Sequence, residues 1–119
     1  MEIFSRVLLG LGDALDMREA RHRVHAENLA NAETPGYRAR ILSFEDQLGS
    51  AMRGEPGGRR VPEAIIDRDA ELKPNGNSVD VDREMARMSS NSVETVALTR
   101  IVARKYGGLK SLLTELGRR

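Results

Sequence analysis

The 119-residue sequence has no cysteine, no tryptophan and only four aromatic residues, two Phe and two Tyr. The absence of cysteine excludes disulfides, thiolate metal ligands and a cysteine nucleophile together. Apolar residues make up 39% of the chain, and a short chain with so few large side chains has little material for an independent globular core. We therefore expect much of its apolar surface to be buried against other chains.

Neither sign of charge is in large excess, since the net charge is only +1. Residues 1–40 carry six basic and six acidic side chains, residues 41–81 carry five and eight, and residues 82–119 carry eight and four. An acidic middle between a neutral and a basic end is typical of protein–protein contact, whereas a nucleic-acid-binding surface needs a strong basic surplus. We expect no nucleic-acid partner.

Long hydrophobic runs are missing as well. The stretch from Ile3 to Leu15 is too short to span a bilayer and contains Arg6 and Asp13. Glu2 stands where a secretory signal has basic residues, and no small-residue cleavage site follows. We therefore expect no membrane span and no cleaved signal peptide, so that export from the cytoplasm would need another route.

The sequence does predict two long helices, one at each end. From Ile3 to about Asn31, apolar residues recur at spacings of three and four. Asp80 or Asp82 can cap the second helix, and Glu84 adds favourable negative charge to its first turn. This helix carries a heptad pattern typical of a coiled coil, formed by Met85, Met88, Ser92, Thr95, Thr99, Val102, Tyr106, Leu109, Leu113 and Leu116.

Two features of these helices leave alternatives open. Gly107-Gly108 is expected either to kink the second helix or to let a neighbour pack closely. The two apolar stripes can pair within one chain, and they can also pack against copies of the chain. The small Ser and Thr residues of the heptad pattern and the lack of aromatic residues favour additional contacts with copies.

The middle of the chain begins with a turn and a loop. Thr34-Pro35-Gly36-Tyr37 predicts a type II turn, because Pro35 presets φ near −65° and Gly36 supplies the positive φ of the third position. Residues 38–48 are predicted to be extended or to include a short helical piece, with Phe44 and Leu48 as anchors. The glycine-rich residues 49–60 are predicted to form a flexible loop.

A β-hairpin is predicted after this loop. Asn75-Gly76 is a strong signal for a type I′ turn, with arms at about residues 64–73 and 78–81. The expected fold is mainly α, with long N- and C-terminal helices that form a coiled-coil-like pair and with a small β-hairpin and a flexible Gly-rich loop between them. The divisions are a helix at 1–33, a turn, loop and hairpin segment at 34–81 and a helix at 82–119, together forming one unit.

Candidate metal ligands occur in the first helix but do not form a complete set. Glu19, His22 and His25 lie on successive helical turns. A di-iron site would need a second Glu-x-x-His from another helix, and a zinc site would need a further ligand. We therefore expect no metal site, with both histidines solvated or at an interface.

Other chemical motifs are equally incomplete. Asp67-x-Asp69-x-Glu71 begins like a calcium loop, but Leu72 and Ser78 occupy the positions where an EF-hand requires Gly and Glu. The sequence has no Gly-x-Ser-x-Gly motif and no phosphate-binding glycine loop. We expect no catalytic residues, no cofactor and no enzymatic activity.

Two segments resemble a known family. Asn28-Leu29-Ala30-Asn31-Ala32-x-Thr34-Pro35-Gly36-Tyr37 is similar to the N-terminal signature of the bacterial flagellar axial proteins, the rod and hook family. Gly76-Asn77-Ser78-Val79-Asp80-Val81-Asp82-x-Glu84-Met85 resembles the segment that opens their C-terminal helix. The resemblance covers about residues 3–48 and 70–116, and within the family the short proximal rod members are the most similar.

This resemblance implies a structural role. It implies a subunit of the proximal rod of the bacterial flagellar basal body, which assembles with copies of itself and serves flagellum-dependent motility. The implied partners are other rod proteins, the rod-base protein FliE and the flagellar type III export apparatus. The implied location is the periplasmic rod, reached without a cleaved signal peptide.

The signature residues are then expected to form a subunit-interface or assembly motif. Two amides and a rigid turn offer hydrogen bonds and a fixed exit direction, but neither a nucleophile nor a proton shuttle. The residues expected in this motif are Asn28, Asn31, Thr34, Pro35, Gly36, Tyr37, Asn77, Val79, Asp80, Glu84 and Met85.

The isolated chain should be only partly ordered. Two long helices with modest apolar stripes bury too little surface to offset an ordering cost of roughly 1–2 kcal/mol per residue, so we expect the termini to fold on assembly. The alternative function, from another class, is a cytoplasmic coiled-coil adaptor or secretion chaperone that binds a partner helix.

Overall fold

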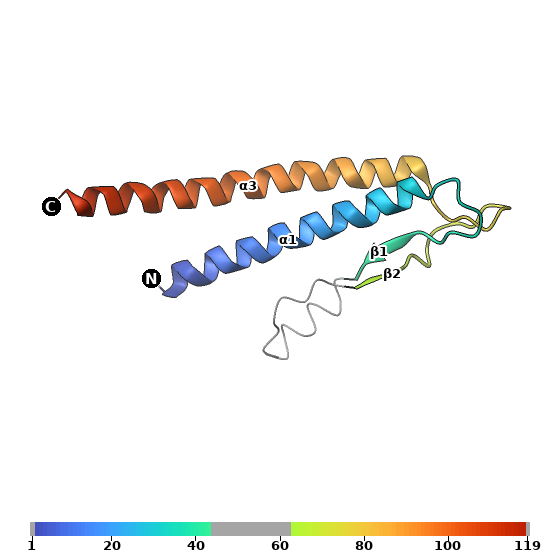
Figure 1. Cartoon of the computed structure of the whole chain (residues 1–119), viewed down its shortest axis with the longest axis horizontal. Helices are drawn as coiled ribbons and strands as arrows, with labels where there is room; N and C mark the ends of the chain where they lie inside the picture. Colours follow the sequence, from blue (N-terminus) through green and yellow to red (C-terminus); the bar gives the residue numbers. More distant parts are fainter. Residues whose placement is uncertain (1, 44–62, 119) are drawn as a thin grey trace.

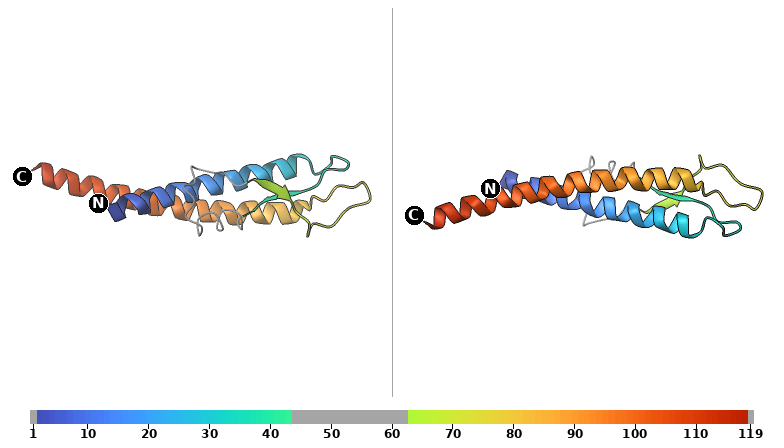
Figure 2. Two further views of the ribbon diagram at one scale, coloured as in Figure 1. Left: turned by 90° about the horizontal axis from the view of Figure 1, so that it is seen from below. Right: turned by 90° about the horizontal axis from the view of Figure 1, so that it is seen from above.

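The fold consists of two long antiparallel helices and two short strands (Figure 1), in a computed structural model that describes residues 2–43 and 63–118. In chain order the elements are α1 (Glu2–Ala30), β1 (Arg40–Leu42), β2 (Ala64–Ile66) and α3 (Val81–Gly117). The molecule is elongated, measuring 71 × 31 × 15 Å, and the helices lie side by side in the further views as well (Figure 2). The expected mainly α fold, with a helix pair and a small antiparallel hairpin between the helices, is confirmed.

The ends of the helices follow from local signals. α1 matches the predicted N-terminal helix to within a residue at each end. At the start of α3, the Asp80 carboxylate accepts a hydrogen bond from the Arg83 N–H at 3.2 Å, so Asp80 rather than Asp82 is the N-cap. Gly107-Gly108 lies within α3, which continues unbroken to its end.

The turn after α1 is confirmed at its decisive position. Gly36 has a φ of 75°, as the third residue of a type II turn requires. The Tyr37 N–H donates to the Thr34 carbonyl at 3.2 Å and closes the turn.

The strand pairing differs from the prediction. β1 and β2 are antiparallel neighbours, with Arg40 opposite Ile66, Ile41 opposite Ile65 and Leu42 opposite Ala64. The predicted hairpin arms at about residues 64–73 and 78–81 are therefore wrong, because the partner of β2 comes from the segment before the glycine-rich stretch. Residues 40–42 adopt the extended one of the two conformations predicted for 38–48.

The predicted type I′ turn is also wrong, although a turn does form at this place. Gly76 has a φ of 79°, but Asn75 does not have the positive φ that a type I′ turn demands. The Gly76 N–H donates to the Lys73 carbonyl at 2.9 Å. Pro74 presets a negative φ at the second position. Residues 73–76 therefore form a turn whose two central residues have negative φ, and only its last residue, Gly76, has a left-handed φ.

The face of α3 that packs on α1 is rotated relative to the predicted heptad pattern. The buried and half-buried positions that recur at spacings of three and four are Glu84, Met88, Asn91, Thr95, Leu98, Val102, Lys105 and Leu109. Every second of these was predicted, but the predicted positions Met85, Ser92, Thr99, Tyr106 and Leu113 are exposed. The rotation occurs because two polar side chains, Glu84 and Asn91, have partners on α1 and therefore face inward.

The described residues contain very little apolar core. The buried apolar residues are Ala20, Val24, Ala32, Ala39 and Val79. Buried polar residues are more numerous, comprising His25, Asn28, Asp67, Asn77, Ser78, Glu84 and Asn91. Because hydrophobic burial is so small, specific hydrogen bonds and ion pairs must hold the elements in place.

Some predictions lie outside the described residues. These are the anchors Phe44 and Leu48 and the flexible loop at 49–60. Among the helices that are described, none combines the length and the apolar character needed to cross a lipid bilayer.

Candidate functional site

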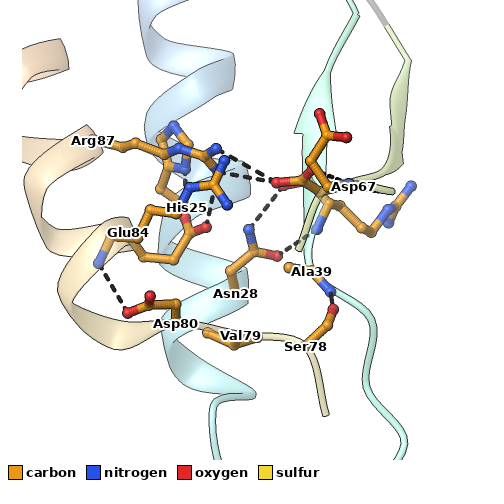
Figure 3. Close-up of polar contacts among 12 residues, drawn as sticks. His25, Asn28, Ala39, Asp67, Ser78, Val79, Asp80, Glu84 and Arg87 are labelled. Carbon is orange, nitrogen blue, oxygen red and sulfur yellow. Dashed lines mark hydrogen bonds and ion pairs between the residues drawn. The ribbon is translucent and has the colours of Figure 1, made fainter. Parts of the chain in front are cut away.

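Most of the buried polar side chains lie at one end of the helix pair, where the end of α1, β1, the segment after β2 and the start of α3 meet (Figure 3). We call this region the joint and define it by His25, Asn28, Asn31, Thr34, Gly36, Tyr37, Ala39, Asp67, Gly76, Asn77, Ser78, Val79, Glu84 and Arg87. Its apolar part is a small cluster of Ala32, Ala39 and Val79, with Tyr37 and Ala70 packed against it.

Asn28 attaches β1 to α1. Its side chain is fully buried. The Nδ2 group donates to the Arg40 carbonyl at 2.8 Å, and Oδ1 accepts from the Arg40 N–H at 3.0 Å and from the Tyr37 hydroxyl at 3.1 Å. One amide therefore pairs with both backbone groups of a single residue, as a neighbouring strand would. The angle between the helix and the strand is fixed by these contacts.

Asn77 closes the C-terminal end of α1 from a distant part of the chain. Its Nδ2 group donates to the carbonyls of Asn31 and Thr34, both at 2.8 Å. These two carbonyls lie just beyond α1 and also accept the backbone N–H groups of Thr34 and Tyr37, at 3.0 and 3.2 Å, so the amide adds a second bond to each of them. Its Oδ1 accepts from the Val79 N–H at 2.7 Å, which ties the same side chain to the approach to α3.

The two turns of the joint touch each other. The Gly36 N–H donates to the Asn75 carbonyl at 3.0 Å. A Cβ atom added to Gly76 would lie 3.3 Å from the Gly36 Cα. This close approach of two backbones, together with the positive φ of both glycines, explains why both positions need glycine.

The segment before α3 and the segment after β2 are joined through residues 37–39, which directly precede β1. The Ala39 N–H donates to the Ser78 hydroxyl at 2.8 Å, and the Ser78 N–H donates to the Tyr37 carbonyl at 3.0 Å. The Asp67 N–H donates to the Ala39 carbonyl at 2.8 Å. The N–H and the hydroxyl of Ser78 are thus occupied, which is why the segment from residue 78 onward does not form the predicted hairpin arm.

A series of hydrogen bonds and ion pairs crosses the joint from α1 to Asp67, the residue after β2. His25 Nδ1 lies 2.6 Å from Glu84 Oε2, and both side chains are buried. Arg87 Nη1 lies 3.3 Å from Glu84 Oε1 and also 3.3 Å from Asp67 Oδ2. A buried carboxylate is costly without partners, and here each carboxylate has a cationic or hydrogen-bonding neighbour. Of the two environments predicted for the histidines, solvated or at an interface, His25 is not solvated, since it is buried between α1 and α3.

The register of the helix pair is fixed by contacts of Asn91 and Glu94 with Arg18, farther along the helices from the joint. Asn91 Nδ2 donates to the Arg18 carbonyl at 2.9 Å, and the Arg18 side chain forms an ion pair with Glu94. Asn91 Oδ1 is the one buried side-chain oxygen or nitrogen without a partner in the described part of the chain.

The predicted motif residues divide into an inner and an outer set. Asn28, Asn77, Val79 and Glu84 are buried in the joint, and Asn31 and Tyr37 are half-buried. Asn31 Nδ2 donates to the Glu27 carbonyl at 2.8 Å, and Oδ1 accepts from the Thr34 hydroxyl at 3.2 Å. The exposed motif residues are Thr34, Pro35, Gly36, Asp80 and Met85.

Tyr37 is the inner residue with a perturbed acidity. Burial raises the pKa of its hydroxyl above the ordinary value, and the nearby negative charge of Glu27 raises the pKa further, whereas Arg40 acts in the opposite direction. A phenol that stays protonated remains a hydrogen-bond donor, which suits its contact with Asn28 Oδ1.

Sequence reasoning missed several members of the joint. Asp67 and Arg87 stand in charged segments that look solvated, and Ser78 gives no signal of its own. His25 could have been found, because it lies one helical turn before Asn28 and on the same face of α1.

The arrangement holds elements together through directional hydrogen bonds and ion pairs. Among the described residues, no group of three or more His, Asp or Glu side chains is placed to hold a metal ion. Most of the side-chain oxygens and nitrogens of the joint have partners within the chain, and these contacts support its geometry.

Comparisons with known proteins give the family. No protein-family model matches the chain. The chain is 32% identical over 126 residues to the flagellar basal body rod protein FlgB of Bacillus subtilis (strain 168), with 96% of this chain and 98% of the relative covered. It is 29% identical to FlgB of Salmonella typhimurium, covering 85% of this chain and 88% of the relative. It is 34% identical to FlgB of Escherichia coli (strain K12), covering 69% and 74% respectively. The resemblance found in the two signature segments thus extends over the chain, which belongs to the family of the flagellar basal body rod protein FlgB.

Proposed function

We propose that the chain is a structural subunit of the proximal rod of the flagellar basal body, which assembles with copies of itself and contributes to motility. The family supports a structural rod subunit, and no relative supports the alternative of a cytoplasmic adaptor or secretion chaperone. The proximal position, self-assembly and the absence of enzymatic activity are parts of the proposal.

The observation that carries the proposal is where the apolar surface lies. Within the described residues, five apolar side chains are buried and fifteen large ones are exposed. Exposed apolar surface on this scale marks contact with other proteins. Nine of the exposed residues lie on α3 and three on α1, so both helices are the surfaces that neighbouring subunits would cover.

The assembly motif has two roles in this proposal. The inner residues, represented by Asn28 and Asn77, fix how β1 and α3 leave the end of α1. The outer residues, among them Pro35 and Met85, contact neighbouring subunits. Met85 is 57% exposed, although it stands one residue from the buried Glu84.

The proposed partners follow from the same reasoning. Copies of this chain, other rod proteins and the rod-base protein FliE would cover the exposed helix faces. The flagellar type III export apparatus would carry the chain to the periplasmic rod without a cleaved signal peptide. A chain whose helices gain most of their burial from neighbours can stay loose during export and order at the growing end.

Fractionation tests the location and the assembly. Basal bodies purified from a bacterium that expresses the tagged chain should contain it in stable amounts after washing at high salt. Recovery of the chain in the cytoplasmic fraction alone would contradict the proposal and favour the adaptor.

Circular dichroism tests the ordering on assembly. The purified monomer should be only weakly helical, with helicity increasing when it is mixed with the other rod proteins. A monomer that is fully helical and melts cooperatively would be evidence against the proposal.

A further inference from the structure

The inward face of α3 continues beyond the point where α1 begins. The hydrogen bond between Asn91 and Arg18 fixes the antiparallel register. Continuing this register places Glu2, the first residue of α1, level with about residue 107 of α3. Figure 1 shows the C-terminal end of α3 extending past the N-terminal end of α1. The last turns of α3 therefore lack the helix that covers the rest of this face.

These last turns carry leucines in the same spacing as the covered face. The inward positions Leu98, Val102 and Leu109 are followed at the same spacings of three and four by Leu112 and Leu116. Leu112 and Leu116 are 54% and 59% exposed, and the adjacent Leu113 is 58% exposed. We call Leu109, Leu112, Leu113 and Leu116 the leucine overhang. The leucine overhang extends the face of α3 that packs on α1, and no helix among the described residues covers it.

The start of α1 exposes apolar residues that the overhang could cover. Ile3 is 80% exposed and Val7 is 41% exposed. They lie one helical turn apart and hence on one face of α1. Leu11 follows Val7 at the same spacing and is half-buried, so the exposure of this face increases toward the start of α1.

Charge decides between two ways of covering the overhang with a second copy. Residues 100–118 carry five basic side chains and one acidic side chain, whereas residues 2–16 carry one basic and three acidic side chains. Two overhangs packed on each other would bring together stretches of like net charge, because residues 109–118 carry two basic side chains and one acidic side chain. An overhang packed on the start of α1 brings together opposite charges.

We propose that the leucine overhang of one copy packs against the Ile3–Val7 face of α1 of a second copy in the same orientation. The inference rests on the proposed function and names the contact by which copies would join. Because the contact is head-to-tail, it leaves a free overhang on the next copy and does not close. The patch is smaller than the roughly 800 Å² per partner of a stable pair, so the contact forms within the assembly and not in dilute solution.

Cysteine cross-linking can isolate this contact, because the sequence has no cysteine of its own. Within one chain, residue 113 lies about seven residues beyond the level of Ile3, or about 10 Å along the helix axis. A disulfide needs Cα atoms within about 7 Å. A disulfide between Ile3→Cys and Leu113→Cys must therefore join two chains.

The experiment is oxidation of basal bodies from swimming cells that express the double variant I3C/L113C, followed by non-reducing electrophoresis. We expect dimers and higher multimers of the chain, with no dimers from either single variant. The matched control pairs I3C with V93C, since Val93 is 71% exposed on a different part of α3, and should give no cross-link. Dimers from L113C alone would overturn the inference, because overhang would then meet overhang.

The two proposals can fail separately. Basal bodies that contain the double variant but give no cross-link refute the inference and leave the proposed function standing. If the unmodified chain is absent from basal bodies, the proposed function fails and the inference fails with it.

A second pair of variants measures the contribution of the overhang without cysteine. L112Q/L116Q keeps a good helix former at each position and should reduce incorporation into basal bodies at least tenfold, with unchanged helicity of the monomer. V93Q/I101Q alters two exposed apolar residues elsewhere on α3 and should reduce incorporation much less. Equal incorporation of the two variants would overturn the inference.

Discussion

Replacing Asn28 with alanine should loosen the whole joint. The substitution removes three hydrogen bonds, two with the backbone of Arg40 and one with the Tyr37 hydroxyl. A hydrogen bond contributes about 1 kcal/mol net, and the better helix propensity of alanine returns about 0.6 kcal/mol. We therefore expect the joint to lose roughly 2–3 kcal/mol of stability.

Asn31→Ala is the matched control, since Asn31 belongs to the same sequence signature and is half-exposed. Its Nδ2 group donates only to the Glu27 carbonyl of its own helix, and water can replace that bond. The backbone carbonyl of residue 31, which accepts from Asn77, is retained in the variant. We expect a loss below about 1 kcal/mol.

Native-state hydrogen exchange reports on the joint even where the outer halves of the helices are loose. The informative amide is that of Asp67, which donates to the Ala39 carbonyl and makes no contact with Asn28. If the joint opens as one cooperative unit, protection of this amide should fall about 50-fold in Asn28→Ala, at a factor of ten per 1.4 kcal/mol. Unchanged protection at Asp67, or an equal loss in Asn31→Ala, would refute the reasoning.

Three further predictions concern the same region. Gly76→Ala should be more destabilising than Gly36→Ala, because both suffer about 1–2 kcal/mol of left-handed strain but only the new Cβ at Gly76 meets backbone, at 3.3 Å; urea denaturation would contradict this if the two variants were equal. His25→Ala should cost roughly 2–3 kcal/mol by removing one of the two partners of the buried Glu84 carboxylate, which keeps Arg87, whereas the exposed His22→Ala should stay within about 0.5 kcal/mol, as compared by thermal melting. The raised pKa of Tyr37 means that its contribution to stability is complete below its ordinary pKa of 10.0 and is lost as the pH rises through the higher folded value; the alkaline decrease in stability should be shallower in Tyr37→Phe, and an identical pH profile would contradict the assignment.

The parts of the fold that were predictable have local causes. The period of the apolar residues gives both helices, Asp80 caps α3, and Pro35-Gly36 determines the turn after α1. Each of these signals acts within a few residues of the chain, so the sequence alone contains it.

The parts that were not predictable depend on contacts between distant residues. β1 and β2 are only three residues each and are separated by more than twenty residues, so no turn signal joins them. The Asn75-Gly76 dipeptide suggested a hairpin, but the Asn77 side chain bonds with carbonyls just after α1, and Ser78 bonds with the segment just before β1. Tertiary contacts thus overrode a strong local signal.

The same reasoning explains the error in the heptad pattern and in the joint. Apolar periodicity assigns polar residues to the surface. Glu84 and Asn91 nevertheless face α1, because they bond with His25 and with the Arg18 carbonyl. Both signature asparagines were recognised as important, but the carbonyl and amide groups that Asn28 binds are backbone groups, which no side-chain pattern reveals.

A joint made of directional bonds matters most for what happens far from it. α3 extends about 55 Å from its N-cap at 1.5 Å per residue, so it acts as a lever whose fulcrum is the network around Asn28, Asn77 and Glu84. A tilt of about 1° at the fulcrum displaces the far tip by about 1 Å, comparable with the tolerance of packed side chains. A hydrophobic core would permit such tilts because its contacts are non-directional, whereas hydrogen bonds with fixed directions resist them. The small polar network can thereby set the alignment of leucines that lie at the opposite end of the molecule.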